Sequence, residues 1–363
     1  MTQSGQTNDA WYTEDGPETD VVLASRIRLA RNLAGFNFPV TIKSDDAEHV
    51  LSLVFDAFNK LDHPERYQMV RMSGIDTTGK RILSERGVIE TGIGNEPWKG
   101  IIIRNDGILS ASINIEDHLR IASFAPGLSL FECAKEVYGI DTATQDHLQF
   151  SAMADFGYLT SGIMNVGTGM KASTLLCIPA ICMNGLLDRV MREYLSQGFV
   201  IKGYYGTDGN ASLGCLYQLS NGSSATGDYE AQIGLVEQAT RKLVDLERKS
   251  RQELLVTNPT TVEDTAYRAI STLKYARFLA LPEAIDLLYR VRLGANLGLV
   301  TGISNHALTA LMYRIQSAHI GFVISGGSVI IEEDVKSDEM RMNRLRAMVV
   351  QEILKEADIR ERR

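Results

Sequence analysis

The feature that most constrains the fold is a change of pattern at the Asn-Gly-Ser-Ser turn of residues 221–224. Before this turn, runs of β-branched and alternating residues are interspersed with helical segments, whereas after it the chain has helical spacing. We therefore expect an α+β fold, with a mixed, mainly antiparallel sheet flanked by helices over 19–224 and a helical C-terminal domain over 225–363. The polar and acidic residues 1–18 are expected to form a flexible arm.

The strongest local signal is the Asn105-Asp106-Gly107 turn. An Asn-Gly or Asp-Gly step between apolar runs is typical of a hairpin, so residues 100–104 and 108–115 are expected to pair as antiparallel strands. Further strands are predicted at 20–29, 173–178, 198–205 and 213–220. Helices are predicted at 45–62, 127–139, 142–155, 182–197, 227–256, 261–279, 282–296, 305–318 and 335–361.

Composition excludes several classes of protein. The net charge of −8 argues against nonspecific binding of nucleic acid by the whole chain. No apolar run approaches the roughly 20 residues that a membrane span needs. The N-terminus has no signal-peptide pattern, so we expect a cytoplasmic location. The cysteines lack a Cys-x-x-Cys pair, which predicts reduced thiols rather than a zinc site or disulfides; they are Cys133, Cys177, Cys182 and Cys215.

Two segments place cations where a phosphate could bind. Arg26 and Arg28 are two residues apart on a predicted strand, so both side chains point to one face. Two guanidinium groups on one face can hold phosphate oxygens bidentately. The glycine turn at 167–169 precedes Lys171 and Ser173, and its backbone N–H groups could add to such a site. The alternatives are a surface strand with salt bridges and an ordinary turn.

A polar cluster, Glu116-Asp117-His118, follows the second strand of the hairpin. Loops at strand ends often carry functional residues on a rigid support. This cluster could bind a metal, perform acid–base chemistry or cap the end of the sheet. Arg120, two residues further on, is another candidate phosphate ligand.

Lys202 precedes a loop of small residues, 206–211. Gly206 and Gly209 would allow this loop to close over a ligand. Asp208 is the carboxylate that such a closure would bring in. An exposed hairpin loop is the alternative.

In this order, the segments resemble the ATP:guanido phosphotransferase family, which includes creatine kinase, arginine kinase and bacterial protein arginine kinases. The resemblance extends over most of residues 20–222 and rests on 25–32, 114–120, 165–170 and 217–221. Three features favour the bacterial protein arginine kinases. The Ser-Arg-Ile-Arg motif begins at residue 25, without the large N-terminal helical domain of phosphagen kinases. The Gly-Thr-Gly-Met-Lys-Ala-Ser motif and the helical extension after residue 225 are also similar to that branch of the family.

The resemblance implies a kinase that transfers the γ-phosphate of ATP, with Mg²⁺, to arginine side chains of proteins. It assigns Glu116 and Asp208 as catalytic residues, with Glu116 holding and deprotonating the acceptor, and it implies no protein metal ligands. It further implies a homodimer, a role in protein quality control or stress response, a McsA-like activator and a ClpC-type unfoldase as partners. The implied nucleotide-binding residues are Ala24, Ser25, Arg26, Ile27, Arg28, Arg120, Lys171, Ala172, Ser173, Thr174, Leu175, Lys202, Gly203, Tyr204, Tyr205, Gly206 and Thr207.

Several positions depart from the family pattern. Ile115 stands where the family has a first glutamate, and Gly162 stands where it has a reactive cysteine. Lys171 and Lys202 replace arginines, so the charge is kept but the planar, bidentate fork is lost. Thr207 occupies the position of a second catalytic carboxylate, for which the neighbouring Asp208 could substitute.

These departures leave alternatives open. The first is a catalytically weak paralogue that acts as a regulatory or adaptor protein. The second is an enzyme for a small guanidino metabolite. Residues 342–347, Met-Asn-Arg-Leu-Arg-Ala, share only their last two residues with the family's Arg-Asp-x-x-Arg-Ala motif for phosphoarginine recognition.

Overall fold

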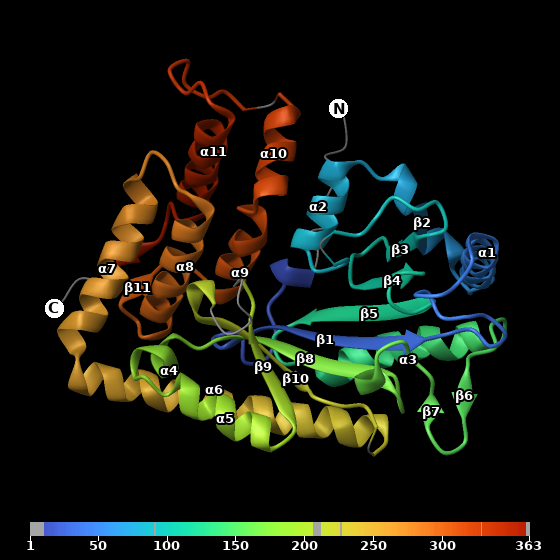
Figure 1. Cartoon of the computed structure of the whole chain (residues 1–363). Helices are drawn as coiled ribbons and strands as arrows, with labels where there is room; N and C mark the ends of the chain where they lie inside the picture. The colour runs from blue at the N-terminus through green and yellow to red at the C-terminus, as the bar shows by residue number, and fades with distance from the viewer. Residues whose placement is uncertain (1–10, 91, 206–211, 226, 328, 361–363) are drawn as a thin grey trace.

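The computed structural model describes residues 11–90, 92–205, 212–225, 227–327 and 329–360. Its centre is an eight-stranded sheet in the order β2-β3-β4-β5-β1-β8-β10-β9 (Figure 1). Each pairing in this sheet is antiparallel. The predicted sheet is therefore confirmed, and its described pairings are all antiparallel rather than mainly so. The strands are β1 Val22–Arg31, β2 Tyr67–Arg71, β3 Gly100–Arg104, β4 Leu109–Ile113, β5 Leu119–Pro126, β8 Met170–Cys177, β9 Phe199–Gly203 and β10 Leu216–Asn221.

Helices cover one face of the sheet, and the C-terminal helices pack over part of the other face (Figure 1). In the first part of the chain they are α1 Ser44–Asn59, α2 Thr77–Glu85, α3 Leu130–Gln145, α4 Pro179–Met183, α5 Leu187–Ser196 and α6 Tyr229–Thr257. The C-terminal helices are α7 Pro259–Tyr275, α8 Leu281–Asn296, α9 Asn305–Arg314, α10 Ser317–Ser325 and α11 Asp338–Ile353. The predicted α+β class is therefore confirmed.

The two faces of β1 explain where a site can form. Ile27 and Leu29 point into a core that α1, α3, α5 and α6 share with the sheet. Arg26 and Arg28 point the other way, because side chains alternate along a strand. On that second face the C-terminal helices pack over only part of the sheet, around Phe124 and Leu175. The uncovered remainder holds the arginines.

The N-terminal segment packs against this second core. Trp11 and Tyr12 are buried. Trp11 stacks on Phe124 with ring centroids 5.5 Å apart, and Tyr12 stacks on Tyr313 of α9 at 4.5 Å. Residues 11–13 of the expected arm thus lie between the sheet and the C-terminal helices, while residues 1–10 lie outside the described residues.

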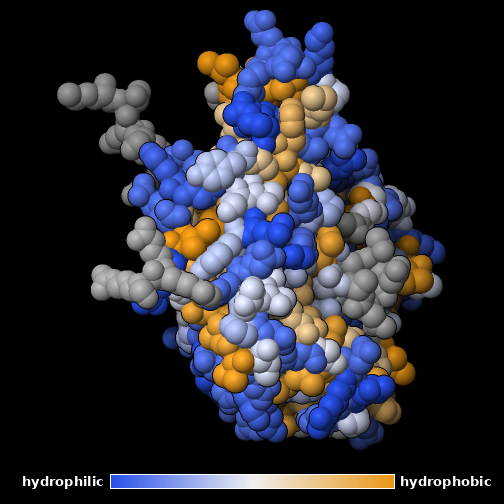
Figure 2. Space-filling view, turned by 90° about the vertical axis from the view of Figure 1, so that its left-hand side faces the viewer, coloured by the Kyte–Doolittle hydropathy of each residue, from blue (hydrophilic) through white to orange (hydrophobic). Residues whose placement is uncertain are grey.

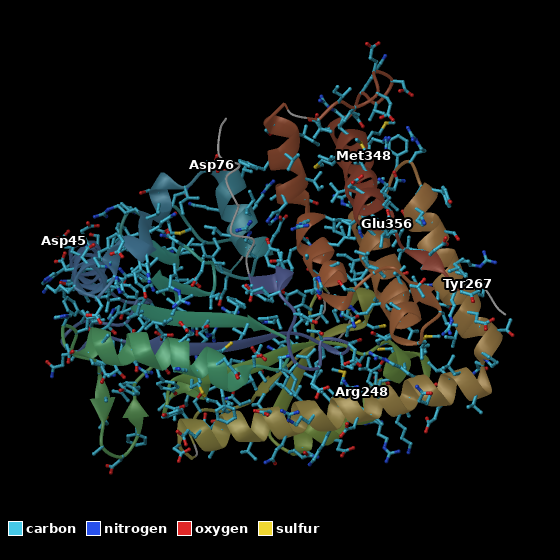
Figure 3. The ribbon with its side chains drawn as sticks, turned by 180° about the vertical axis from the view of Figure 1, so that it is seen from behind. Asp45, Asp76, Arg248, Tyr267, Met348 and Glu356 are labelled. Atoms are coloured by element: carbon cyan, nitrogen blue, oxygen red, sulfur yellow. The ribbon has the colours of Figure 1, made fainter. Side chains whose placement is uncertain are left out.

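The C-terminal helices form one side of the molecule. Figure 2 shows hydrophobic side chains scattered among charged ones over that side. On the opposite side of the sheet, α6 runs beneath the strands, and its Arg248 is labelled in Figure 3. In the part of the chain that the structure describes, no helix is long and apolar enough to cross a membrane.

Several predicted elements were wrong in extent. The helix predicted at 142–155 does not exist; α3 runs on to Gln145, and the small hairpin of β6 Ala152–Met153 and β7 Gly157–Tyr158 follows. Gly157 has a φ of +71° and lies against the backbone of Gly167, where a side chain would collide. The two glycines are only ten residues apart, but the pattern of apolar residues between them does not indicate this close approach.

Two other predicted helices are interrupted. The segment 305–318 divides into α9 and α10, because Gln316 is extended between them with a ψ of 151°. Residues 182–197 similarly divide at Gly185, which has a φ of +67°. The last helix ends at Ile353, and residues of β12 Asp358–Ile359 then pair with β11 Val300–Thr301.

Candidate active site

Five cations from four strands converge on the open face of the sheet. Arg28 of β1 lies opposite Lys171 of β8, and Arg26 lies opposite Ser173. Lys202 of β9 lies opposite Gln218 of β10. Arg120 comes from β5, on the other side of β1. Cross-strand neighbours on one face are close enough for their side chains to interact.

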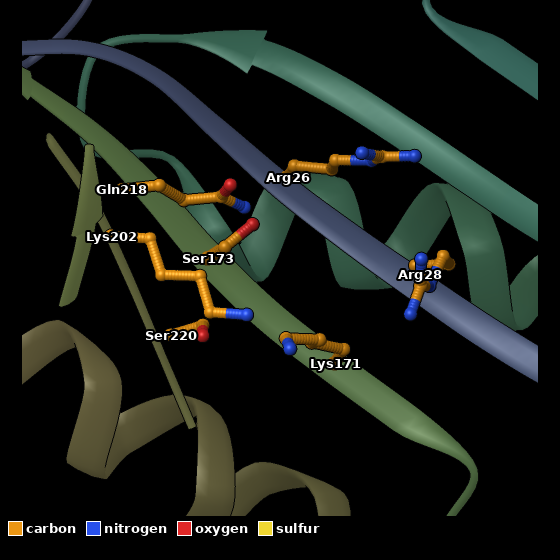
Figure 4. A pocket seen from close by; sticks show the side chains of 7 residues that line it. All are labelled: Arg26, Arg28, Lys171, Ser173, Lys202, Gln218 and Ser220. Atoms are coloured by element: carbon orange, nitrogen blue, oxygen red, sulfur yellow. The ribbon is translucent and has the colours of Figure 1, made fainter. Parts of the chain in front are cut away.

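Four of these cations line a pocket of about 160 Å³ (Figure 4). The wall is otherwise polar, with two hydroxyls and an amide from β8 and β10. The lining residues are Arg26, Arg28, Lys171, Ser173, Lys202, Gln218 and Ser220. A small cavity with this lining suits an anion that has several hydrogen-bond acceptors.

The charges in this cluster are poorly balanced. Burial, together with the neighbouring Arg120 and Arg26, lowers the pKa of Arg28 to about 9. Burial and the nearby Arg28 and Lys202 lower the pKa of Lys171, and burial lowers the pKa of Arg26. Within the described residues, none of Arg26, Lys171 and Lys202 has a carboxylate within 4 Å. The protein therefore holds positive charge that an anion would stabilise.

Arg120 differs from the other cations because carboxylates surround it. Its Nε is 2.8 Å from Asp117 Oδ2, its Nη2 is 2.5 Å from Glu116 Oε1, and its Nη1 is 3.5 Å from Glu90 Oε1. Asp117 also accepts hydrogen bonds from Asn32 Nδ2 and from the backbone N–H of Ser161. Asp117 is thus fully occupied in holding the Arg120 guanidinium, whereas Glu116 is 41% exposed.

His118 has a structural role. Its Nδ1 accepts from the backbone N–H of Leu33 at 3.0 Å, and its Nε2 lies 2.9 Å from the carbonyl oxygen of Asn37. These partners fit a neutral ring with its proton on Nε2, and burial lowers the pKa of His118. Of the three roles considered for the cluster, Asp117 and His118 therefore fit the sheet cap, and Glu116 alone is available for chemistry.

Gly162 lies directly beside Glu116. A Cβ added at Gly162 would be 3.2 Å from Glu116 Oε1 and 3.3 Å from Asn165 Nδ2. Position 162, singled out from the sequence by motif alone, is thus part of the wall around Glu116. Any side chain there would contact the carboxylate.

A second pocket of about 120 Å³ adjoins the first and shares Arg26 and Arg28 with it. Its remaining wall comes from β4, β5, Ile115 and the segment after α2, including Glu90. No sequence motif points to Glu90, Ser110 or Ser112. The alternation of β4 indicates that the two serines share a face, but nothing local indicates that residues 87–90 fold over it.

The other predicted nucleotide-binding residues lie on two opposite faces of the sheet, because side chains alternate along a strand. Ala24, Leu175, Gly203, Tyr204 and Tyr205 line a larger cavity of about 660 Å³ that continues from the first pocket.

Ser25, Ile27, Ala172 and Thr174 face the opposite side of the sheet. Ser25 Oγ donates to the carbonyl oxygen of Gly127, and the Thr174 hydroxyl pairs with that of Thr240. Ile27 and Ala172 belong to the core.

Part of the predicted site cannot be placed. Gly206, Thr207 and Asp208 lie outside the described residues. Just before them, the hydroxyl of Tyr205 accepts a hydrogen bond from Gln316 Nε2 at 3.1 Å, so the C-terminal helices contact this edge of the site. Over the described ranges, no group of three or more His, Cys, Asp or Glu residues is placed to hold a metal ion.

Cations that converge on an anion pocket, with the exposed carboxylate of Glu116 nearby on Arg120, have the chemistry that phosphoryl transfer uses. Residues 49–250 match the family model for "ATP:guanido phosphotransferase, C-terminal catalytic domain". Residues 259–363 match the "Protein-arginine kinase McsB C-terminal domain". The chain belongs to the ATP:guanido phosphotransferase family, as its motifs predicted.

Relatives and solved structures agree with this assignment. The chain is 32% identical over 340 residues to "Protein-arginine kinase" of Geobacillus sp. (strain WCH70), covering 93% of this chain and 94% of that one. It is 29% identical over 338 residues to the protein of the same name from Bacillus subtilis (strain 168), covering 93% of both chains.

Solved structures show the same fold at low identity. A lombricine kinase matches 64% of this chain and 68% of its own, with a TM-score of 0.55 and 19% identity. A taurocyamine kinase from Schistosoma mansoni matches 75% of this chain and 42% of its own, with a TM-score of 0.58 and 18% identity.

Proposed function

We propose that this chain is a protein-arginine kinase, which transfers the γ-phosphoryl group of ATP to arginine side chains of proteins. The observation that carries this proposal is the cluster of Arg26, Arg28, Lys171 and Lys202 around one pocket, with Glu116 beyond Arg120. The names of the relatives that match nearly the whole chain support the choice of acceptor.

In this proposal the triphosphate enters the cation-lined pocket, and the nucleoside extends into the larger cavity beside Tyr204. Phosphoryl transfer needs little covalent chemistry from the protein, so positioning and charge stabilisation dominate. Arg26, Arg28, Lys171 and Lys202 neutralise the phosphate oxygens. Arg120 is held through its Nε by the buried Asp117 and lines the adjoining second pocket, next to Arg26 and Arg28.

Glu116 acts on the acceptor. An acceptor Nη attacks the γ-phosphorus, the bond from that phosphorus to the bridging oxygen breaks, and its electron pair leaves with ADP. The proton lost by the attacking nitrogen goes to a Glu116 oxygen. Because arginine has a pKa above about 12, this proton must leave as the N–P bond forms rather than beforehand. The exposed Glu116 carboxylate can hold the guanidinium fork and accept that proton.

The residues fit Mg²⁺ that arrives with the nucleotide. The described residues hold no carboxylate cage, and the pocket wall is cationic. Mg²⁺ in such sites is held mainly by phosphate oxygens and water, with one or two protein carboxylates at most. Bound to the phosphates, it would neutralise charge on the transferred group.

We extend the proposal to the setting of the enzyme. The four cysteines are free thiols, which suits the cytoplasm. The match of residues 259–363 to the McsB C-terminal domain supports a homodimer that works with a McsA-like activator and a ClpC-type unfoldase in protein quality control.

A second candidate function is a nucleotide-binding regulatory protein with weak catalysis. Ile115 favours it, because this side chain lines the second pocket and supplies no charge. Lys171 and Lys202 favour it as well, since an ammonium lacks the bidentate fork of arginine.

The test is transfer of labelled phosphate from Mg-ATP to an unfolded, arginine-rich protein and, separately, to free arginine. Acid-labile label, located on arginine by mass spectrometry, is the expected result, and Glu116→Gln should reduce it by about 10²-fold or more. Label on free arginine alone would indicate a small-molecule kinase. ATP binding without transfer, with candidate activators present, would establish the regulatory alternative.

A further inference from the structure

We propose that Gln316, from the helical C-terminal region, selects the adenine base of ATP through its side-chain oxygen. This assignment rests on the proposed function and deepens it, because it names a residue that distinguishes one nucleotide from another. Gln316 lies outside residues 49–250, which match the catalytic-domain model. That match therefore gives Gln316 no role, and only its place in the fold brings it to the nucleotide cavity.

The cavity that Gln316 lines continues from the anion pocket. It has a volume of about 660 Å³ and shares Arg26, Ser173, Lys202 and Gln218 with that pocket. This volume lies within the roughly 300–1,000 Å³ that is typical of small-molecule sites. A nucleotide whose phosphates occupy the anion pocket can therefore extend its base into this cavity.

Four aromatic side chains line the cavity, and they are Phe124, Tyr204, Tyr205 and Tyr313. The rings of Tyr204 and Tyr205 meet edge to face, with their centroids 4.8 Å apart. Aromatic side chains stack on every base, so they can hold a base without identifying it. Selection among bases requires a hydrogen-bonding group at the base edge.

The amide of Gln316 is held in one orientation. The residue is only 5% exposed. Its Nε2 donates to the carbonyl oxygen of Met312 at 2.8 Å and to the hydroxyl of Tyr205 at 3.1 Å. Because a carbonyl oxygen can only accept, the amide nitrogen must face Met312, and this fixes the position of Oε1. Among the described residues Oε1 has no donor, yet it is not sealed in the interior, so it is free to accept from a ligand in the cavity.

The backbone around Gln316 is fixed as well. Gln316 is extended between α9 and α10, with a ψ of 151°. Its carbonyl oxygen accepts from the backbone N–H of Ile320, in α10, at 3.0 Å. The carbonyl oxygen of Ile315 accepts from Nε of the buried Arg346 at 2.9 Å. The side-chain oxygen of Gln316 is thus presented from a rigid support, as selective recognition requires.

A fixed acceptor in this cavity discriminates adenine from guanine. Adenine carries the amino group N6–H₂, which donates hydrogen bonds, whereas guanine carries the acceptor O6 at the same position. Oε1 can accept from the amino group, but against O6 it would face a second acceptor. Turning the amide to offer Nε2 instead would break its hydrogen bond to Met312. A site with a fixed hydrogen-bonding group rejects analogues that leave this group unpaired.

The same contacts allow a purely structural role. Through Met312 and Tyr205, Gln316 also joins the C-terminal helices to the segment after β9. The two roles predict different effects of replacing Gln316. Loss of a structural contact would weaken the binding of every purine nucleotide equally. Loss of a base-selecting acceptor would weaken only the binding of nucleotides that carry the 6-amino group.

The experiment compares the binding of ATP with that of purine-riboside triphosphate, which lacks the 6-amino group. Calorimetry in the presence of Mg²⁺ measures both Kd values for the full-length wild type, for Gln316→Met and for the control Gln351→Met. Gln351 is also a partly buried glutamine that donates to a backbone carbonyl, that of Ala276 at 2.8 Å, but it does not line this cavity. We expect wild type to bind ATP about tenfold more tightly than the analogue, and Gln316→Met to show a preference below about twofold.

Gln351→Met should keep the wild-type preference, and GTP should bind wild type more weakly than ATP does. Equal affinity of wild type for ATP and the analogue, an equal weakening of both in Gln316→Met, or a preference that survives in Gln316→Met would overturn the assignment. So would a wild type that binds neither nucleotide.

The ratio of the two Kd values separates this inference from the proposed function, because it does not depend on phosphoryl transfer. If wild type transfers no phosphate to arginine, but its preference for ATP disappears in Gln316→Met, the kinase proposal fails and the base contact stands. If wild type transfers phosphate to arginine and binds both nucleotides equally well, the kinase proposal stands and the base contact fails.

Discussion

Two clusters of charged residues lie on opposite faces of the sheet. They show how the same types of side chain can serve stability in one place and function in another. Beneath the sheet, Glu247 of α6 pairs with Arg251 at 2.9 Å and accepts the backbone N–H groups of Ala180 and Ile181. Asp20 pairs with Arg251 and Arg248. Each charge in this lower cluster has a partner.

In the upper cluster, on the open face of the sheet, the positive charges are not balanced by carboxylates. Arg26, Lys171 and Lys202 lie without carboxylates within 4 Å among the described residues, and the pKa of Arg28 is lowered to about 9, chiefly by burial. Burying unpaired charge costs stability, which natural proteins tolerate mainly at functional sites. Charge balance, and not burial alone, therefore distinguishes the structural cluster from the candidate active site.

The largest effect is expected when a charge is removed from the balanced, lower cluster. Glu247→Ala should lower the free energy of unfolding by about 3–5 kcal/mol, because it leaves Nε of Arg251 and two buried backbone N–H groups without their acceptor, while Asp20 still pairs with Nη1 of Arg251. Chemical denaturation measures this change. The control is Asp245→Ala, at an exposed position of the same helix, which should stay within about 0.5 kcal/mol of wild type. Equal effects of the two substitutions would contradict the proposed difference.

Removing a charge from the unbalanced, upper cluster should leave the stability of the fold unchanged and should strongly reduce activity. Arg28→Met should lower kcat for phosphoryl transfer by about 10²–10³-fold, as loss of a transition-state donor does. Its melting temperature should equal or exceed that of wild type, since the repulsion from Arg26 and Arg120 is relieved. A loss of stability like that of Glu247→Ala would show that Arg28 is structural.

The pKa of Arg28 gives a pH prediction. Burial, Arg120 and Arg26 lower this pKa to about 9 in the folded protein, and a bound polyphosphate would raise it again. ATP binding should therefore take up protons near pH 9 and weaken as the pH rises through 9. Calorimetry in buffers of different ionisation enthalpy measures the uptake, which should be largely lost in Arg28→Met.

The same depressed pKa has a consequence for folding. Below pH 9 the folded protein carries a charge that the unfolded chain holds more easily, so this site opposes folding there. The opposition should fade as the pH rises from 9 towards the higher, ordinary pKa of an arginine in the unfolded chain. Relative to Arg28→Met, the wild type should thus gain stability as the pH rises above 9; a difference between the two proteins that did not change with pH would argue against a depressed pKa.

The smallest effect is expected for Lys171→Arg. Arginine keeps the charge and adds a planar fork, so kcat should stay within about threefold of wild type or rise. Steady-state kinetics with a protein acceptor measures this change. A collapse of activity would mean that the pocket is shaped for an ammonium at this position.

Much of the fold could be predicted because its signals are local. The Asn105-Asp106-Gly107 turn does join β3 to β4, and helical spacing correctly indicated a C-terminal helical region. Errors arose where packing, rather than local pattern, sets the backbone conformation. Gly157 packs against Gly167, and Gln316 breaks the chain between α9 and α10 beside Tyr205.

The residues of the candidate site were likewise predicted in part and missed in part. Motif order pointed to Arg26, Arg28, Arg120, Lys171 and Lys202, and the structure brings them together on one face. Glu90, Ser110 and Ser112 were missed, because their place in the second pocket depends on a segment folding back over the sheet.

The sequence by itself determined which side chains share a face of each strand, since alternation is a property of the backbone. It thereby placed Arg26 and Arg28 opposite the Ile27 and Leu29 core. Only the tertiary structure decided which of three adjacent polar residues is available for chemistry. Asp117 and His118 are occupied by partners from remote segments, whereas Glu116 is exposed beside Gly162. Availability depends on what the rest of the chain packs around a residue, and that packing is long-range.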